Sequence, residues 1–305
     1  EKNMIRLNSI EQHANESMKQ SPNAVVMVRP HYFQPNPQTL ADNSFQQKME
    51  DNCQHVSDRA LKEVSDAVNE LRQHGVMVHL FEDKTKETPD SVFPNNWFTT
   101  HANGQLGIFP MYCENRRKER SSEIIDYLKE QYHVEQVVDY SNYEQQQIYL
   151  EGTGSMVLDN VNRIAYAVKS KRMNQQLFSR FCADFNYEGI AFDASDENGV
   201  AVYHTNVMMC VGTEFALVGL SLITDYIERD YVCSKLENSH KEVIELSSEQ
   251  IAQFAGNALE LSTDNGPLLV VSSTAYQSLT QEQIRRISRY VKILPLNVTT
   301  IEKAG

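Results

Sequence analysis

The segment Val202-Tyr-His-Thr-Asn-Val-Met-Met209 places a histidine and an amide in a run that otherwise predicts an apolar strand. His204 and Asn206 are two residues apart, so both side chains would project from the same face of that strand. Imidazole is the natural general acid and base near neutral pH, and a neighbouring amide can hold a substrate. A histidine with a purely structural role explains the same pattern.

Two other segments put polar side chains beside turn-forming residues. Asn95 and Asn96 directly precede Trp97, the only tryptophan, and amides suit neutral amide or ureido groups because they both donate and accept. Glu151 directly precedes Gly-Thr-Gly. The two glycines have no side chains, so they can leave the carboxylate of Glu151 accessible. An Asn-rich turn and a plain β-turn are the structural alternatives. The glycine spacing matches neither common phosphate-binding pattern.

A basic segment, Lys169-Ser-Lys-Arg-Met-Asn-Gln175, follows one predicted strand and opens a predicted helix. The guanidinium of Arg172 could bind a carboxylate through two parallel hydrogen bonds. A solvated basic turn is the alternative.

The elements that would position these residues alternate between β-rich runs and amphipathic helical patterns, which indicates an α/β fold. The predicted strands are Ala24–Arg29, Val76–Phe81, Gly107–Pro110, Arg163–Val168, Gly189–Phe192, Ala216–Leu220 and Leu268–Val271. The predicted helices are Asp51–His74, Arg117–Gln131, Asn174–Phe185 and Thr280–Val291. Thr280 with Gln283 three residues later predicts a capping box at the start of the last helix.

A period of about 50–65 residues relates these segments, as in folds built from repeated supersecondary units. Strand pairs open near Ala24, Ser91, Ile148, Ala201 and Asn257, and a helix and a further strand follow most of them. We expect five pseudo-repeats in a single domain over residues 1–305. The polar segment Asp225–His240 is the candidate for a flap.

Charge and composition limit the classes of partner and cofactor that we expect for this protein. The net charge of −13 makes nucleic acid and anionic membranes unlikely partners, and no apolar run approaches the length of a membrane span. The five scattered cysteines predict reduced thiols, and the dispersed histidines predict no metal site. We therefore expect a cytoplasmic protein with a small-molecule partner and no cofactor; a homo-oligomer is compatible.

Taken together, the segments resemble the superfamily of arginine deiminases, dimethylarginine hydrolases and amidinotransferases, from about Val25 to the end of the chain. Pro89-Asp-Ser-Val-Phe-Pro-Asn-Asn96 is similar to Pro-Asp-Ser-Val-Phe-x-Glu-Asp, and Leu150-Glu-Gly-Thr-Gly resembles the Glu-Gly-Gly-Asp stretch. Ser170-Lys-Arg-Met-Asn-Gln resembles Ser-Lys-Arg-Thr-Asn-Gln, and His204-Thr-Asn206 stands where deiminases have His-x-Asp. The resemblance implies a five-bladed α/β propeller (pentein) with pseudo-fivefold symmetry.

The resemblance also implies roles for the residues that match its motifs. His204 would be the general acid and base, and Glu151 would orient it. A cysteine thiolate would attack the guanidino or ureido carbon, an amine would leave, and water would hydrolyse the covalent intermediate. The nucleophilic cysteine of the family lies in a glycine-rich stretch near the C-terminus, so we expect it beyond Gly305.

The remaining matches concern the substrate, an arginine-like amino acid. Arg172 would bind its carboxylate and Asp90 its α-amino group, with Asn95, Asn96 and Asn206 near the reacting group. Asn96 and Asn206 replace aspartates that hold a guanidinium in deiminases, and paired amides suit a neutral ureido group.

This replacement predicts citrulline as the substrate, cleaved to ornithine, ammonia and carbon dioxide. Phe93-Pro-Asn-Asn-Trp-Phe98 and Phe254-Ala-Gly-Asn-Ala-Leu-Glu-Leu261 look closest to the citrulline-utilisation hydrolases. Arginine deimination and amidino transfer remain alternatives. A ligand-binding protein without a nucleophile is an alternative of another class.

Overall fold

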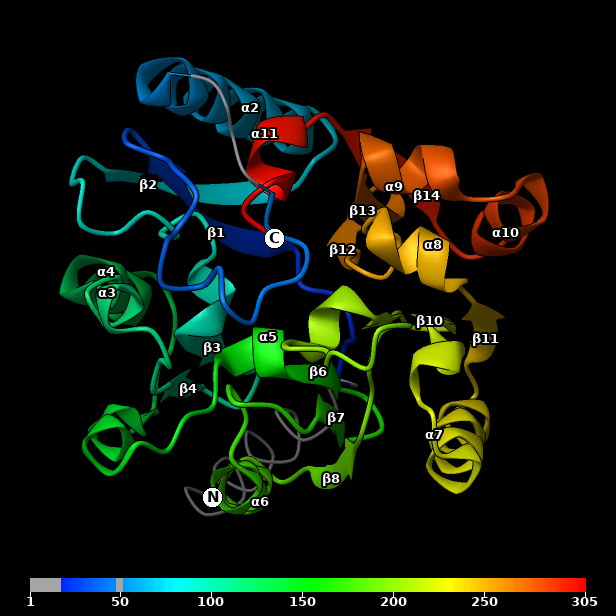
Figure 1. Ribbon diagram of the computed structural model, residues 1–305. Coiled ribbons are helices and arrows are strands. Elements are labelled where there is room, and N and C mark those ends of the chain that lie inside the picture. Colours follow the sequence, from blue (N-terminus) through cyan, green and yellow to red (C-terminus); the bar gives the residue numbers. More distant parts are fainter. Residues whose placement is uncertain (1–17, 48–51) are drawn as a thin grey trace, which may run out of the picture.

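The computed structural model describes residues 18–47 and 52–305, whose strands form five separate sheets (Figure 1). One sheet pairs β1 (Ala24–Pro30) with β2 (Met77–Asp83). The other four are β3 (Phe98–Thr100), β4 (Gln105–Ile108) and β5 (Gln136–Asp139); β6 (Met156–Asp159), β7 (Ile164–Val168) and β8 (Glu188–Phe192); β9 (Met209–Val211), β10 (Phe215–Val218) and β11 (Glu242–Glu245); β12 (Leu259–Thr263), β13 (Gly266–Ser272) and β14 (Lys292–Leu296).

Each three-stranded sheet repeats one topology. The first two strands are antiparallel neighbours, and the third returns parallel to the second after a helical connection. The helices of these connections are α3 (Glu114–Arg117), α4 (Ser122–Gln131), α6 (Gln175–Asp184), α7 (Tyr226–Asn238), α9 (Ser273–Ser278) and α10 (Gln281–Ile287), and α2 (Cys53–Gln73) connects β1 to β2 in the two-stranded sheet. The predicted order of strands, helix and further strand is therefore confirmed.

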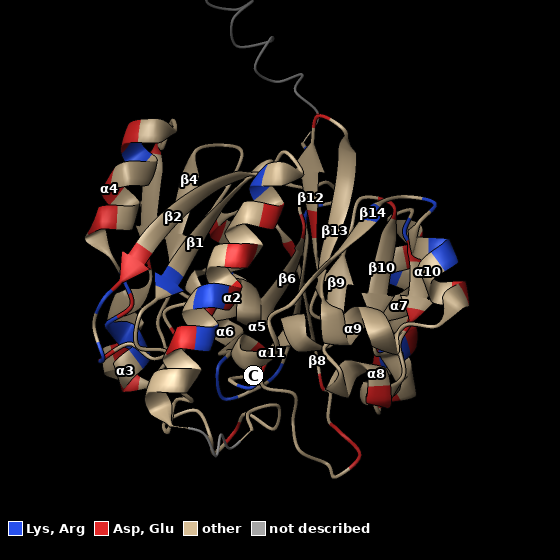
Figure 2. Cartoon of the chain, turned by 90° about the horizontal axis from the view of Figure 1, so that it is seen from above, with Lys and Arg blue, Asp and Glu red and all other residues tan. Residues whose placement is uncertain are grey.

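Local sequence explains where the helices begin. The Asn174 side chain accepts a hydrogen bond from the Leu177 amide, and Thr280 and Gln283 form the predicted capping box. Buried positions along α2, including Val56, Ala60 and Val64, recur every four residues and form one apolar face toward the sheet. Charged residues colour the outer helices, among them α2, α4 and α10 (Figure 2).

Three expectations about single elements were wrong. The segment Asp225–His240 is not a flap, because α7 buries Val232 and Leu236 in the core. The segment Val202–Met209 is not one strand, since a 3₁₀ turn, η3 (Thr205–Val207), precedes β9. Arg117–Gln131 divides into α3 and α4. Asp51, the predicted start of α2, lies outside the described residues.

Short turns precede the first strands of the three-stranded sheets. They are η1 (Pro94–Asn96) before β3, α5 (Gly152–Ser155) before β6, η3 before β9, and α8 (Ser248–Ala252) some residues before β12. The remaining short elements are η2 (Ser141–Gln146), η4 (Leu220–Leu222) and α11 (Thr299–Glu302). Since α5 contacts both η1 and η3, the sheets bring three polar turns together.

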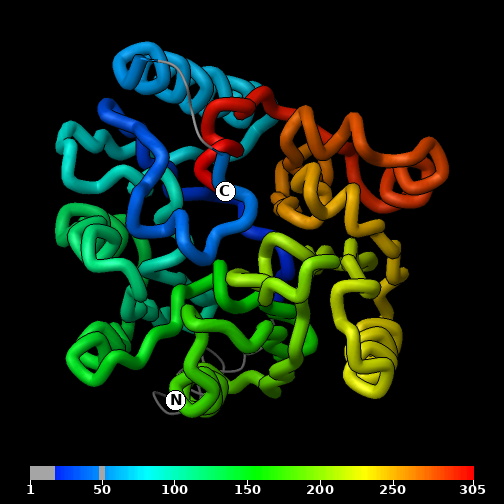
Figure 3. The backbone as a smooth tube through the Cα atoms, in the orientation of Figure 1, coloured from blue at the N-terminus to red at the C-terminus, as the bar shows by residue number. Residues whose placement is uncertain are grey.

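The last described residues pack beside the loop between β1 and α2 (Figure 3). Asn43 Nδ2 donates to the carbonyl oxygen of Ala304 at 3.0 Å, and the Gln47 amide donates to that of Lys303 at 2.9 Å. These bonds fix the loop, defined here as residues 36–47, against α11 and its C-terminal end.

Candidate active site

His204 and Glu151 form a buried hydrogen-bonded pair at the junction of η3 and α5. His204 Nε2 lies 2.7 Å from Glu151 Oε1, and both side chains are almost completely excluded from solvent. The backbone fixes this geometry, because Thr205 Oγ1 donates to the Ser155 carbonyl oxygen at 2.6 Å and accepts from the Val168 amide at 2.8 Å. The two predicted catalytic residues are thus in contact although they are far apart in sequence.

The electrostatics of this pair determine which imidazole nitrogen is basic. Burial opposes ionisation of Glu151, but Arg172 and the hydrogen bond from His204 outweigh it and lower the carboxyl pKa to about 2. Burial lowers the pKa of His204 to about 4, against the effect of Glu151. At neutral pH a neutral imidazole therefore donates its Nε2 proton to an ionised carboxylate, which leaves Nδ1 as the base.

Arg172 lies on the other side of Glu151, and its guanidinium is already engaged. It donates to Asp42 through Nε at 3.0 Å and Nη2 at 2.7 Å, and to Glu151 through Nη1 at 3.4 Å. The ring of Tyr203 lies 4.8 Å from the guanidinium carbon. The position that we predicted for a substrate carboxylate is thus held by the side chain of Asp42, from the loop 36–47.

Asn96 lies against α5 and the imidazole. A Cβ at Gly154 would collide with Asn96 Nδ2 and lie 2.8 Å from His204 Nδ1, so the amide nitrogen and the basic nitrogen face the same glycine. Asn96 Oδ1 accepts a hydrogen bond from Arg116 Nη1 at 2.9 Å. Only a residue without a side chain allows this close approach.

Arg116, Glu119 and Asp42 are site residues that the sequence analysis missed. Arg116 forms a two-armed pair with buried Glu119, at 3.0 and 3.1 Å, and burial raises the pKa of Glu119 to about 7. The spacing of Arg116 and Glu119 in Asn-Arg-Arg-Lys-Glu-Arg is a helical i, i+3 pair and was a usable signal. Asp42 offered none, since its partner is 130 residues away.

The other predicted binding residues, Asp90, Asn95 and Asn206, differ in the contacts that they make around this site. Asp90 is buried; its Oδ2 accepts from Asn36 at 2.8 Å, and its Oδ1 has no hydrogen-bond partner within the described residues. Asn95 contributes its carbonyl oxygen, which accepts from Thr153 Oγ1 at 3.3 Å. The half-buried Asn206 accepts through its backbone oxygen from Asn257 at 3.0 Å. Their roles toward a substrate stay predictions.

Two buried cysteines, Cys113 and Cys210, are poor nucleophiles where they stand. Cys113 follows Tyr112, whose amide donates to Glu151, but its thiol is buried and donates to the Gln38 carbonyl oxygen at 3.5 Å. Burial raises the thiol pKa to about 11 for Cys113 and to about 12 for Cys210 on β9. Little thiolate forms at neutral pH at either position.

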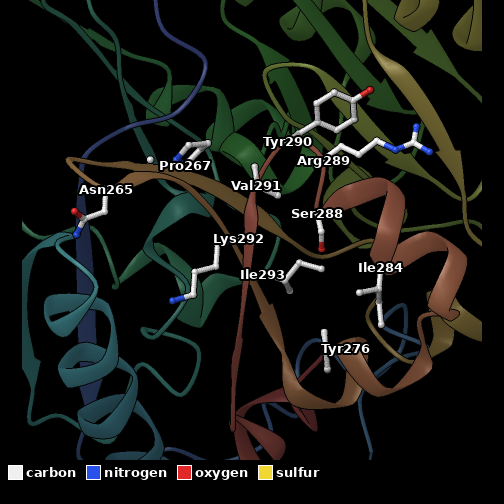
Figure 4. Close-up of a pocket in the computed structure, with 11 residues that line it drawn as sticks. Asn265, Pro267, Tyr276, Ile284, Ser288, Arg289, Tyr290, Val291, Lys292 and Ile293 are labelled. Atoms are coloured by element: carbon white, nitrogen blue, oxygen red, sulfur yellow. The ribbon is translucent and has the colours of Figure 1, made fainter.

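The described residues contain neither a membrane-spanning helix nor a metal-binding cluster. None of their helices is long and apolar enough to cross a membrane, and none of their His, Cys, Asp and Glu clusters could hold a metal ion. A groove of about 510 Å³ lies beside β14 and α10, lined by Tyr276, Arg289 and Lys292 among others (Figure 4). None of its lining residues belongs to the polar cluster, defined here as Asp42, Asp90, Asn96, Arg116, Glu119, Glu151, Arg172 and His204.

Replacing Gly154 with Ala is expected to displace both Asn96 and His204, because the new Cβ collides with both side chains. We expect kcat for the reaction at this candidate site to fall about a hundredfold and the free energy of unfolding to fall by about 1–3 kcal/mol. Steady-state kinetics and urea unfolding measure the two effects. In the control Gly199→Ala the Cβ meets no atom within 4 Å, so kcat should be unchanged, whereas the φ of +75° at this position strains an alanine and should by itself lower the free energy of unfolding. A Gly154→Ala protein with normal kcat would contradict this packing.

Comparison with known proteins gives the family. Residues 29–305 match the model of the family described as N,N dimethylarginine dimethylhydrolase, eukaryotic. The chain belongs to this family. The resemblance to guanidino-modifying enzymes, inferred from the motifs, is thereby confirmed. No curated protein sequence matches the chain.

Solved structures of this superfamily share the fold at low sequence identity. The N-terminal domain of the cyanobacterial arginine dihydrolase ArgZ, solved with its substrate, has a TM-score of 0.71 and 16% identity, covering 92% of this chain and 94% of that domain. Dimethylarginine dimethylhydrolase from Pseudomonas aeruginosa, solved with citrulline, has a TM-score of 0.60 and 15% identity, covering 94% and 96%. AgrE has a TM-score of 0.71 and 16% identity, but this chain spans only 37% of it.

Proposed function

We propose that this family member is a cysteine-dependent hydrolase that cleaves citrulline to ornithine, ammonia and carbon dioxide. The observation that carries the proposal is the pairing of a basic imidazole nitrogen with an amide NH₂ at one glycine, Gly154. The amide can donate to a ureido oxygen while the imidazole moves protons at the adjacent carbon. No organic cofactor or metal is needed for this chemistry.

The proposed reaction proceeds in two steps. A thiolate, whose proton has passed to His204 Nδ1, attacks the ureido carbon and forms a C–S bond. The C–N bond to the side chain then breaks, and His204 returns the proton to the leaving amine, which gives ornithine. Water, deprotonated by His204, next cleaves the C–S bond, and the carbamate released decomposes to ammonia and carbon dioxide. Glu151 holds the imidazole in the required tautomer throughout.

Asp90 is proposed to receive the α-ammonium group of the substrate. Its Oδ1 is buried without a hydrogen-bond partner among the described residues, and burial raises the pKa of the carboxyl group. An orphaned carboxylate oxygen is costly unless a donor reaches it, and an ammonium group is such a donor.

Arg172 is proposed to bind the substrate carboxylate after displacing Asp42. The side chain of Asp42 is partly exposed and sits at hydrogen-bonding distance on both arms of the guanidinium, as a substrate carboxylate would. A charged occupant of this position must compete with the substrate.

Replacing Asp42 with Asn should therefore lower KM for citrulline, since the amide pairs less strongly with Arg172 than a carboxylate does. We expect a decrease of about three- to tenfold with little change in kcat. Steady-state kinetics of Asp42→Asn measures it, with Asp58→Asn on the exposed face of α2 as the matched control. A raised KM would mean that Asp42 helps to bind the substrate instead.

The nucleophile is proposed to be a cysteine in residues that follow Gly305. The polar turns Pro94–Asn96, Gly152–Ser155 and Thr205–Val207 each precede a first strand, whereas β1 pairs only with β2 among the described residues. A strand antiparallel to β1, preceded by a cysteine-bearing turn, would complete the fifth sheet in the same pattern. The whole would then be a five-bladed propeller forming one catalytic domain.

Amino-acid chromatography of reactions with citrulline, arginine and dimethylarginine tests the proposal. Ornithine from citrulline, abolished by thiol alkylation, is the expected result. Citrulline from arginine would indicate deimination, and a new amidino compound formed from arginine only when glycine is added would indicate transfer. Calorimetric binding of citrulline without any product would indicate the ligand-binding alternative.

A further inference from the structure

Arg116 is a buried cation outside the predicted catalytic set, and it touches Asn96. Its Nη1 donates to Asn96 Oδ1 at 2.9 Å and its Nη2 to the Phe93 carbonyl oxygen at 3.4 Å. The side chain is 3% exposed, and that of its partner Glu119 is 1% exposed. Glu119 holds the guanidinium by two hydrogen bonds, and Asp90 Oδ2 lies 3.7 Å from Nε.

This contact fixes which end of the Asn96 amide faces the reacting group. A guanidinium has only donors, so the atom of Asn96 opposite Nη1 must be the oxygen. The amide NH₂ then points away from Arg116, toward Gly154 and His204, and it makes no hydrogen bond in the part of the chain that the structure describes. Turning the amide over would place a donor against a donor.

The fixed orientation has a consequence for the substrate that an asparagine alone does not have. A freely rotating amide could offer its oxygen to a guanidinium, whose nitrogens all donate, as readily as its nitrogen to a ureido oxygen. With the oxygen held by Arg116, only the donor remains for the substrate. The fixed donor matches the ureido oxygen, and it opposes a guanidinium with another donor.

We propose that Arg116, held by Glu119, is a positioning residue that orients the Asn96 amide and thereby selects ureido over guanidino substrates. The proposal rests on the proposed function, because it explains how that site would distinguish citrulline from arginine. Arg116 does not itself contact the reacting carbon.

The test compares the ratio of kcat/KM for citrulline to that for arginine in three variants. Arg116→Met/Glu119→Met removes both charges of the buried pair. It also takes the nearby cation away from Asp90, but this affects both substrates alike, because each carries the same α-ammonium group, and so cancels in the ratio. Arg116→Lys keeps a donor that can reach Asn96. Lys118→Met, an exposed neighbour paired with Glu87, is the matched control. Circular dichroism and thermal unfolding establish that each variant is folded.

We expect the double variant to lower this ratio by at least about tenfold, while Arg116→Lys restores most of it and Lys118→Met leaves it unchanged. A merely structural Arg116 would lower the rates for both substrates and keep their ratio, which would overturn the proposal. A wild-type protein that does not turn over citrulline would instead contradict the proposed function. The dissociation constants of citrulline and arginine, measured calorimetrically, then supply the ratio on which Arg116 is tested.

Discussion

Glu151→Gln is expected to lower kcat for citrulline by at least about a thousandfold, with KM changing by less than about threefold. The glutamine can keep a contact with His204 Nε2, but its NH₂ group donates where the carboxylate accepted. The imidazole would then carry its proton on Nδ1 and lose its basic nitrogen toward the substrate. Loss of the carboxylate also removes the charge that stabilises the imidazolium formed during the reaction.

Steady-state kinetics on purified Glu151→Gln measures this effect, with Glu188→Gln as the matched control. Glu188 pairs with Lys235 at the surface and lies outside the polar cluster, so its replacement should leave kcat unchanged. A Glu151→Gln protein that keeps more than about a tenth of the wild-type kcat would show that the tautomer of His204 is not what Glu151 determines.

Arg172→Met is expected to have the largest effect on stability. The guanidinium is almost completely buried between Asp42 and Glu151, so its removal leaves Glu151 as a buried charge without its main counterion. Breaking a buried pair in this way costs about 3–5 kcal/mol. The methionine fills much of the same volume, which limits the contribution of a cavity.

Urea unfolding at pH 7 measures the loss as a lower midpoint at constant slope. The control is Arg180→Met, which removes an exposed pair with Asp184 on α6 and should leave the free energy of unfolding nearly unchanged. An Arg172→Met protein as stable as that control would mean that Asp42 and Glu151 are compensated by other groups.

Acid unfolding gives a second measure of how much the ion pair of Glu151 with Arg172 stabilises the folded protein. The pKa of Glu151 lies at about 2 in the folded protein, below the ordinary value of 4.5 for a glutamate. Its ionised form therefore contributes stability that is fully present above pH 4.5 and is lost as the pH falls through 2. Without Arg172 the folded pKa rises, so the variant should lose less stability than the wild type over this interval.

Local patterns in the sequence predict the repeating elements because their causes lie within one segment. The capping box Thr280–Gln283, the apolar face of α2 and the strand Ile164–Val168 all follow from neighbouring residues. The family resemblance implies the contact between His204 and Glu151, although the expected strand around His204 is a 3₁₀ turn. Such a turn of three residues is too short to leave a periodic signal.

The residues that escaped prediction act through contacts between distant segments. Asp42 reaches Arg172 only because loop 36–47 packs on the segment after β7, and Arg116 reaches Asn96 only because α3 packs on the turn before β3. Nothing near Asp42 in sequence indicates its partner. The spacing of Arg116 and Glu119 indicates their pairing, but it does not show that Arg116 is buried while its neighbours Arg117 and Lys118 are half-buried and exposed. A tertiary structure is needed to separate an arginine that orients an amide from one that is solvated.

A competition assay tests the central claim most directly. Equal concentrations of citrulline, arginine and dimethylarginine are mixed with protein whose C-terminal sequence has been verified by mass, and all amino acids are followed by chromatography. We predict that citrulline disappears first, that ornithine accumulates in equal amount, and that arginine stays constant. Consumption of arginine or dimethylarginine ahead of citrulline would contradict the assignment of Asn96 as a donor to a ureido oxygen.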